Sequence, residues 1–158
     1  MQQRLIKIIN NRLTSNQKKF LAEVIGTFIV VVFATGSVVL DAKMNGILGI
    51  PFIAFAPFVG VAISIYLFGK ISMAHFNPAV TIGFFIIKHI TKIQLAYYFA
   101  AQIIGALLGS LFVKYFIGIQ ANLGANAPNY AFPLPLILGI ITNVEGIQTQ
   151  RIYIVGYS

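Results

Sequence analysis

The pattern of hydrophobic and polar positions divides the chain into long apolar runs joined by short polar connections. The runs extend over residues 20–40, 50–68 and 93–116. The third contains GALLG, whose paired glycines allow two helices to approach closely. An α-helix of about 20 residues crosses the roughly 30 Å hydrocarbon core of a bilayer. The pattern therefore predicts an all-α integral membrane protein with three transmembrane helices.

A fourth apolar stretch, ISMAHFNPAVTIGFFII, connects the second and third runs. Because a predicted span lies on each side of it, both of its ends must lie on the same side of the membrane. Its residues 78–87 would form about 15 Å of helix, half the hydrocarbon thickness. We therefore predict a re-entrant half-helix, whose irregular backbone must pack on protein or line a wet cavity.

Asn77 and Pro78 mark the start of this predicted half-helix. Asn is a favoured N-cap, and proline suits the first helical position because its missing N–H would be unpaired there. A helix N-terminus carries roughly half a positive charge, which repels cations, while a carboxamide hydrogen-bonds to polar solutes. The dipeptide alone also fits an ordinary helix start on a loop. Its place within an apolar, half-spanning segment favours a site for a neutral, hydrogen-bonding solute.

Composition supports a single membrane domain and excludes several chemistries. The chain is 58% hydrophobic and 9% charged, with a mean hydropathy of +0.88, whereas soluble domains carry roughly a quarter charged residues. It contains no cysteine, so disulfides and cysteine-ligated metals are excluded. An enzyme is not expected, because one glutamate and one histidine at membrane depth do not form a catalytic cluster. Neither a cofactor nor a metal is predicted, and the dispersed basic residues do not indicate nucleic-acid binding.

The basic residues predict the orientation. The segment 1–19, expected to be either a surface-lying amphipathic helix or a solvated tail, carries Arg4, Lys7, Arg12, Lys18 and Lys19. The connection between the second and third spans carries Lys70, Lys88 and Lys92. Because positive residues favour the cytoplasmic side, we expect a multi-pass protein of the cell membrane with a cytoplasmic N-terminus.

Three motifs together resemble the first half of the aquaporin, or major intrinsic protein, family. They are AEVIGTFIVVVFATGS in the first span, GKISMAHFNPAVTIG in the half-spanning segment and AAQIIGALLG in the third span. The resemblance covers residues 20–116. It implies the first inverted repeat of the aquaporin fold, a channel for water or small neutral solutes such as glycerol, and a tetrameric homo-oligomer. The implied partners are the lipid bilayer and these solutes.

The resemblance also implies roles for individual residues. The first pore motif corresponds to Asn77, Pro78 and Ala79, and the positions that brace the re-entrant loop correspond to Glu23, His75 and Gln102. An ionisable residue within a span is costly and normally finds a polar partner, which independently favours a buried Glu23. Two alternatives stay open: Glu23 reaches the cytoplasmic interface, or Gln102 makes an ordinary interhelical hydrogen bond.

Two positions depart from the family pattern. The narrow filter normally receives a bulky side chain from the second span, and ungapped counting places Pro57 there; Phe55 or Phe58 would serve if the helix shifts register. Met73 occupies the usual place of a glycine.

Residues 117–158 are expected to form a loop and an aberrant remnant of a fourth span. The second repeat, its Asn-Pro-Ala motif and its filter arginine are missing, which favours a truncated or frame-shifted product. The leading hypothesis is a channel subunit of aquaporin type. The alternative is a truncated, non-conducting membrane protein that associates with or modulates full-length channels.

Overall fold

The computed structural model describes residues 14–124. These residues form the helices α2 (Ser15–Lys43), α3 (Gly49–Ser72), α4 (Pro78–Ile86), α5 (Lys92–Phe116) and the short α6 (Gln120–Gly124). No strand occurs in this part of the chain. The predicted N-terminal basic segment lies largely outside the described residues, and so does nearly all of the predicted remnant of a fourth span.

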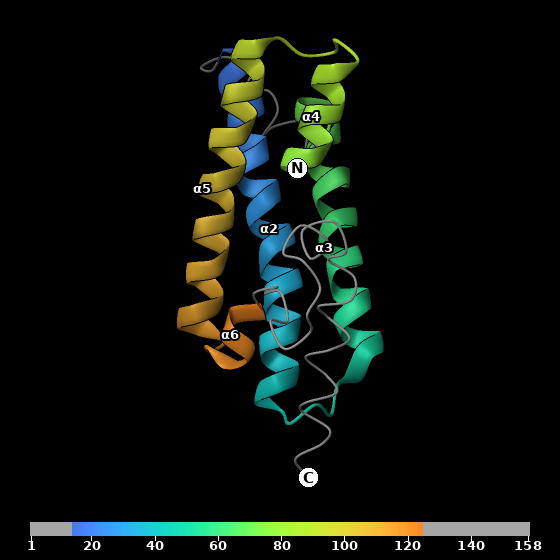
Figure 1. Cartoon of the computed structure of the whole chain (residues 1–158), viewed down its shortest axis with the longest axis vertical. Coiled ribbons are helices and arrows are strands. Elements are labelled where there is room, and N and C mark those ends of the chain that lie inside the picture. The colour runs from blue at the N-terminus through green and yellow to red at the C-terminus, as the bar shows by residue number, and fades with distance from the viewer. Residues whose placement is uncertain (1–13, 125–158) are drawn as a thin grey trace, which may run out of the picture. The chain divides into compact units, whose positions relative to one another are not determined.

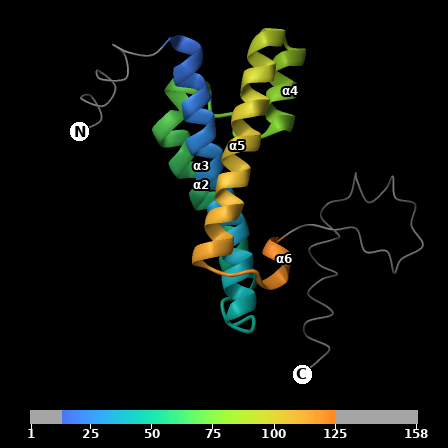
Figure 2. The ribbon, with the colours of Figure 1, turned by 90° about the vertical axis from the view of Figure 1, so that its left-hand side faces the viewer.

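Three of the helices, α2, α3 and α5, are long and apolar enough to cross a membrane. Helix α2 packs against both α3 and α5, and α4 packs against α5 (Figures 1 and 2). Helix α4 has nine residues, about 14 Å of helix, too short to cross. The all-helical class with three membrane-length helices and one short helix is confirmed.

Polar caps start two of the long helices outside their apolar runs. Thr14 and Gln17 form a reciprocal capping box at α2, and Thr91 and Gln94 form another at α5. In each pair the two side chains accept from two backbone N–H groups at the helix end. Helix α2 consequently begins five residues before its apolar run. The apolar run marks only the residues expected in the lipid, whereas the capping residues determine where the helix begins.

Glycines allow the close packing of α2 on α5 that the GALLG spacing indicates. A Cβ on Gly105 would overlap the Val24 carbonyl oxygen, and a Cβ on Gly109 would lie 3.1 Å from the Phe28 carbonyl oxygen. The two backbones therefore meet without intervening side chains. Many apolar side chains of α3 and α4 are exposed, as expected for surfaces that face lipid or further protein.

The end of the bundle that contains the α2–α3 turn is joined by polar contacts. Asp41 Oδ1 accepts a 2.7 Å hydrogen bond from the backbone N–H of Gly49 at the start of α3. Lys43 Nζ donates at 2.8 Å to the Ile117 carbonyl oxygen after α5. Both contacts satisfy backbone groups that helix ends leave unpaired.

Candidate functional site

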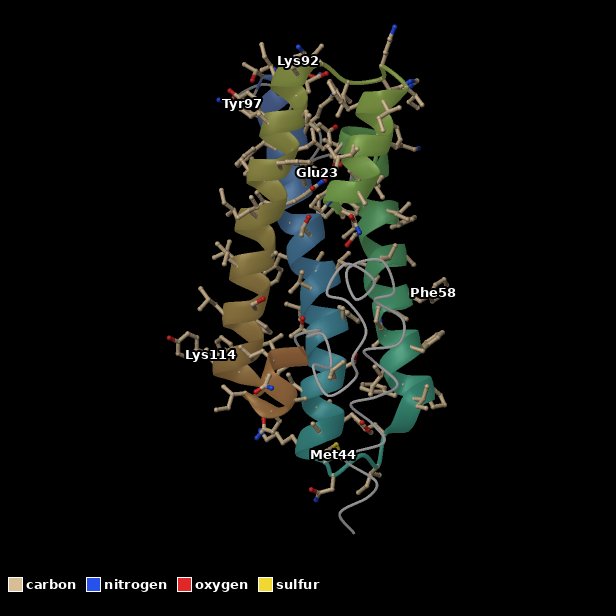
Figure 3. All side chains as sticks on the ribbon, in the orientation of Figure 1. Glu23, Met44, Phe58, Lys92, Tyr97 and Lys114 are labelled. Carbon is tan, nitrogen blue, oxygen red and sulfur yellow. The ribbon has the colours of Figure 1, made fainter. Side chains whose placement is uncertain are left out.

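The loop between α3 and α4 is held by a buried carboxylate of α2. Glu23 Oε1 accepts from the His75 backbone N–H at 3.0 Å, and Oε2 accepts from the Phe76 N–H at 2.8 Å. Glu23 is 0% exposed, and Figure 3 shows it between the helices, nearer to Lys92 than to Lys114. The carboxylate thus satisfies loop donors that would otherwise be buried without partners.

Gln102 connects this carboxylate to α4. Its Nε2 donates to Glu23 Oε2 at 2.9 Å and to Thr81 Oγ1 at 2.8 Å. An ionised carboxylate only accepts hydrogen bonds, so the amide nitrogen of Gln102, and not its oxygen, must face Glu23. Residues from α2, α4 and α5 therefore meet in one buried polar network.

His75 completes the network. Its Nδ1 lies 3.1 Å from Thr81 Oγ1, and its ring is stacked between Phe84 and Tyr98, with centroid distances of 4.2 and 4.3 Å. Thr81 Oγ1 also lies 3.1 Å from the Asn77 carbonyl oxygen, to which its hydroxyl can donate. Whether His75 Nδ1 donates to Thr81 Oγ1 or accepts from its hydroxyl depends on the tautomer of the ring.

Two atoms of the network have no hydrogen-bond partner within residues 14–124. They are His75 Nε2 and Gln102 Oε1, both buried. Gln102 Oε1 is an acceptor, and the tautomer of His75 decides whether Nε2 donates or accepts.

The loop adopts strained backbone conformations. Three non-glycine residues have positive φ: Met73 at 66°, Ala74 at 54° and Phe76 at 46°. The left-handed region costs a non-glycine residue roughly 1–2 kcal/mol. The hydrogen bonds that the loop N–H groups donate to Glu23 therefore hold the loop in a shape that its own backbone preferences oppose.

The Asn77-Pro78-Ala79 motif begins α4 and is exposed in the described part of the chain. Asn77 Oδ1 caps the helix by accepting from the Ala79 N–H at 2.8 Å. No group within residues 14–124 accepts from its Nδ2. The motif thus presents a carboxamide donor at a helix N-terminus.

The depth of this helix start follows from Gln102. Gln102 comes ten residues after Lys92 in a helix of 25 residues, which corresponds to about 15 Å from that end of α5. Through Thr81, the first turn of α4 is hydrogen-bonded at this level. The start of α4 is therefore close to the middle of the membrane-length bundle.

The structure does not bring the three predicted filter residues into the network. Phe55 and Phe58 are 62% and 63% exposed and contact each other, with ring centroids 5.7 Å apart. Figure 3 shows Phe58 directed away from α2. Pro57 lies within α3 and is partly exposed. Their filter role stays a prediction.

Sequence reasoning did not assign a role to three residues of the site. Thr81 accepts from Gln102 and contacts His75 Nδ1. The rings of Phe84 and Tyr98 both lie against the His75 ring, and the Tyr98 hydroxyl donates to the Ser72 carbonyl oxygen at 2.7 Å. One available signal was spacing: Tyr98 precedes Gln102 by four residues and so shares its helix face.

The described residues contain no group of three or more His, Cys, Asp or Glu side chains placed to bind a metal.

Membrane-length helices joined through a short helix that starts inside the bundle define the class: this is a multi-pass membrane protein. The family model described as major intrinsic protein matches residues 10–143. The chain belongs to the major intrinsic protein family.

Curated relatives come from plants, bacteria and archaea. Aquaporin NIP1-1 of Zea mays is 33% identical over 141 residues, which cover 85% of this chain and 50% of the relative. Glycerol uptake facilitator protein-like 6 of Lactiplantibacillus plantarum is 42% identical over 109 residues, 67% of this chain and 48% of the relative. Aquaporin AqpM of Methanothermobacter marburgensis is 37% identical over 137 residues, 73% of this chain and 56% of the relative. The chain spans about half the length of these relatives.

Proposed function

We propose that this chain forms part of the wall of a membrane channel that passes water or small neutral solutes. The observation that supports this most directly is the position of α4. Its N-terminus, with the Asn77 carboxamide, is held near mid-bundle by the buried Glu23 and Gln102 contacts. The names of the relatives, aquaporins and a glycerol uptake facilitator, support the same solute class.

The chemistry of this helix start suits neutral solutes. Asn77 Oδ1 is engaged with the Ala79 N–H, so the remaining amide protons are the groups that can donate to a solute oxygen. The positive end of the α4 dipole adds to this donor character and disfavours cations and protons. A water or polyol oxygen accepts such a hydrogen bond without carrying charge.

Reconstitution tests this function. The full chain is inserted into liposomes, and the rate of osmotic shrinkage is followed by stopped-flow light scattering. Asn77→Asp should lower the protein-dependent permeability about tenfold, because a carboxylate removes a donor worth about 1.4 kcal/mol to the passing solute. The matched control is Asn45→Asp, which changes an exposed asparagine in the α2–α3 turn and should leave permeability unchanged. Equal permeability in a folded Asn77→Asp variant would contradict the proposal.

The alternative is a non-conducting protein that associates with complete channels. It is favoured by the exposure of the Asn77-Pro78-Ala79 motif within residues 14–124. If the chain alone shrinks liposomes no faster than protein-free controls, autonomous conduction is excluded. The same chain added to liposomes that contain a complete relative would then reveal any modulation.

We further propose that the N-terminus is cytoplasmic and that the chain forms homo-oligomers. The orientation is supported by lysine counts, and oligomers are supported by the exposed apolar surface of the helices. Light scattering of the detergent-solubilised protein during size exclusion measures the oligomeric state, and a mass of one chain would contradict the second proposal.

A further inference from the structure

One end of the bundle is strongly basic. The start of α2, the end of α3, the end of α4 and the start of α5 lie at this end (Figure 1). We call it the lysine end, defined by Lys18, Lys19, Lys70, Lys88 and Lys92. The only acid of the described residues near it is Glu23, which is fully buried and engaged with the loop. The exposed lysines at this end, Lys70, Lys88 and Lys92, form no ion pair with the acidic side chains of residues 14–124.

Helix stability does not explain the positive charge at the starts of α2 and α5. Lys92 is the first residue of α5, and neither α2 nor α5 has an acid in its first turn. A lysine beside the positive end of a helix dipole is locally unfavourable. The neutral capping boxes, and not charge pairs, stabilise both starts. Lys92 thus opposes the local electrostatics of α5, whereas Lys70 lies in the last turn of α3 and Lys88 directly follows the end of α4, where the helix dipole favours a positive charge.

Exposed apolar side chains lie beside the three exposed lysines. Ile87 precedes Lys88 and is 65% exposed, and Ile93 follows Lys92 and is 68% exposed. Leu67, 42% exposed, lies one turn before Lys70. Positive side chains at the edge of an apolar surface match a molecule with an anionic head and hydrocarbon tails.

The opposite end differs in charge. Its described charged residues are Asp41, Lys43 and Lys114, and the first two cap neighbouring helix ends. Figure 3 shows Lys92 and Lys114 at opposite ends of α5.

We propose that the lysine end binds the phosphate groups of anionic phospholipids, with Lys70, Lys88 and Lys92 as the principal contacts. The charge favours an anion and the adjoining isoleucines favour a lipid over a soluble phosphate. This binding is independent of solute passage, so it holds for a conducting and for a non-conducting chain.

Spin-labelled lipids measure the binding directly. The full chain is reconstituted in phosphatidylcholine with traces of spin-labelled phosphatidylglycerol or phosphatidylcholine, and the protein-associated fraction of each is read by electron paramagnetic resonance. We expect phosphatidylglycerol to associate about threefold more strongly, since each interfacial lysine attracts anionic lipid. The preference should weaken at high salt, because ions screen exposed charges. Equal association of both lipids at low salt would overturn the proposal.

Variants locate the binding. Replacing Lys70, Lys88 and Lys92 together by glutamine should abolish the preference, while glutamine keeps the length and helix propensity of the side chains. Lys92→Gln and Lys114→Gln form a matched pair on one helix. Lys92→Gln should reduce the preference and Lys114→Gln should not. An equal loss of the phosphatidylglycerol preference in Lys92→Gln and Lys114→Gln would overturn the assignment to the lysine end. If the triple variant does not fold, these two single variants test the location of the binding.

Inorganic phosphate separates the two anion sources. Millimolar phosphate, compared with chloride at the same ionic strength, should leave lipid association unchanged. Displacement of phosphatidylglycerol by phosphate would show a site for the free anion and overturn the commitment to lipid.

Discussion

Glu23 shows how one side chain shapes the site. Its two oxygens receive three hydrogen bonds, two from the α3–α4 loop and one from Gln102. The sequence left two alternatives open for these residues: that Glu23 reaches the cytoplasmic interface, and that Gln102 makes only an ordinary interhelical hydrogen bond. The carboxylate is 0% exposed, so it does not reach the interface, and Gln102 bonds to Thr81 of α4 as well as to α2. The hydrogen bond of Gln102 to Glu23 thus joins α5 to α2 and also belongs to the network that holds the α3–α4 loop.

At this scale we predict that Glu23→Gln destabilises the protein by about 2 kcal/mol or more. The introduced amide places donors against the donors of Phe76 and Gln102, and a buried unsatisfied donor costs about 1–3 kcal/mol. Thermal unfolding in detergent, followed by circular dichroism, measures the loss.

The control is the swap Glu23→Gln with Gln102→Glu. It keeps a carboxylate–amide pair between α2 and α5 but moves the carboxylate away from the loop N–H groups. The swap should remain destabilised. Full recovery of stability would show that Glu23 serves only the interhelical pair.

At the scale of elements, the short helix α4 depends on the strained loop before it. Met73 ends α3 in the left-handed conformation, with φ of 66°, at a position where the aquaporin resemblance leads one to expect glycine. Glycine adopts this conformation without the steric cost that a Cβ brings. The loop shape is thus imposed by the buried network on a residue that disfavours it.

We predict that Met73→Gly stabilises the protein by about 1 kcal/mol, the cost of the left-handed conformation. Met44 offers a matched control, because it also ends a helix but has φ of −96°. Met44→Gly should bring no gain, since glycine there only adds freedom to the unfolded chain. A Met73→Gly variant that unfolds at the same temperature as the parent, or a lower one, would refute the strain argument.

At the scale of the whole molecule, the lysine end and the opposite end define an orientation. The exposed side chains between them are largely apolar, and exposed tyrosines lie toward both ends, including Tyr97 at 47% and Tyr115 at 75% exposure. Tyrosine is enriched at membrane interfaces. The two tyrosines are 18 residues apart on α5, about 27 Å of helix, close to the hydrocarbon thickness.

This arrangement predicts the labelling pattern of single cysteines. The chain contains no native cysteine, so Asn16→Cys and Met44→Cys, both at exposed positions, report the two ends without background. A membrane-impermeant maleimide added to intact cells should label position 44 and leave position 16 unlabelled. Both should react after permeabilisation. The reverse pattern on intact cells would place the N-terminus outside.

Local patterns in the sequence determined the helices and their class. Apolar runs located the membrane-length helices because burial in lipid acts on every residue of a span. Asn77 and Pro78 located the start of α4 because capping depends on neighbouring residues alone. The apolar run of the third span begins within one residue of α5, whereas α2 begins at its capping box five residues before its apolar run.

Only the tertiary structure decided how these elements meet. Glu23 lies 52 residues from His75 and 79 residues from Gln102 along the chain, so neither periodicity nor capping relates them. The same holds for Thr81 and Tyr98, whose roles follow from the packing of α4 and α5 around the His75 ring. Side-chain hydrogen bonds and ring contacts act over a few ångströms. The sequence by itself determined which segments are helical and apolar, and the fold decided which polar groups share the space between them.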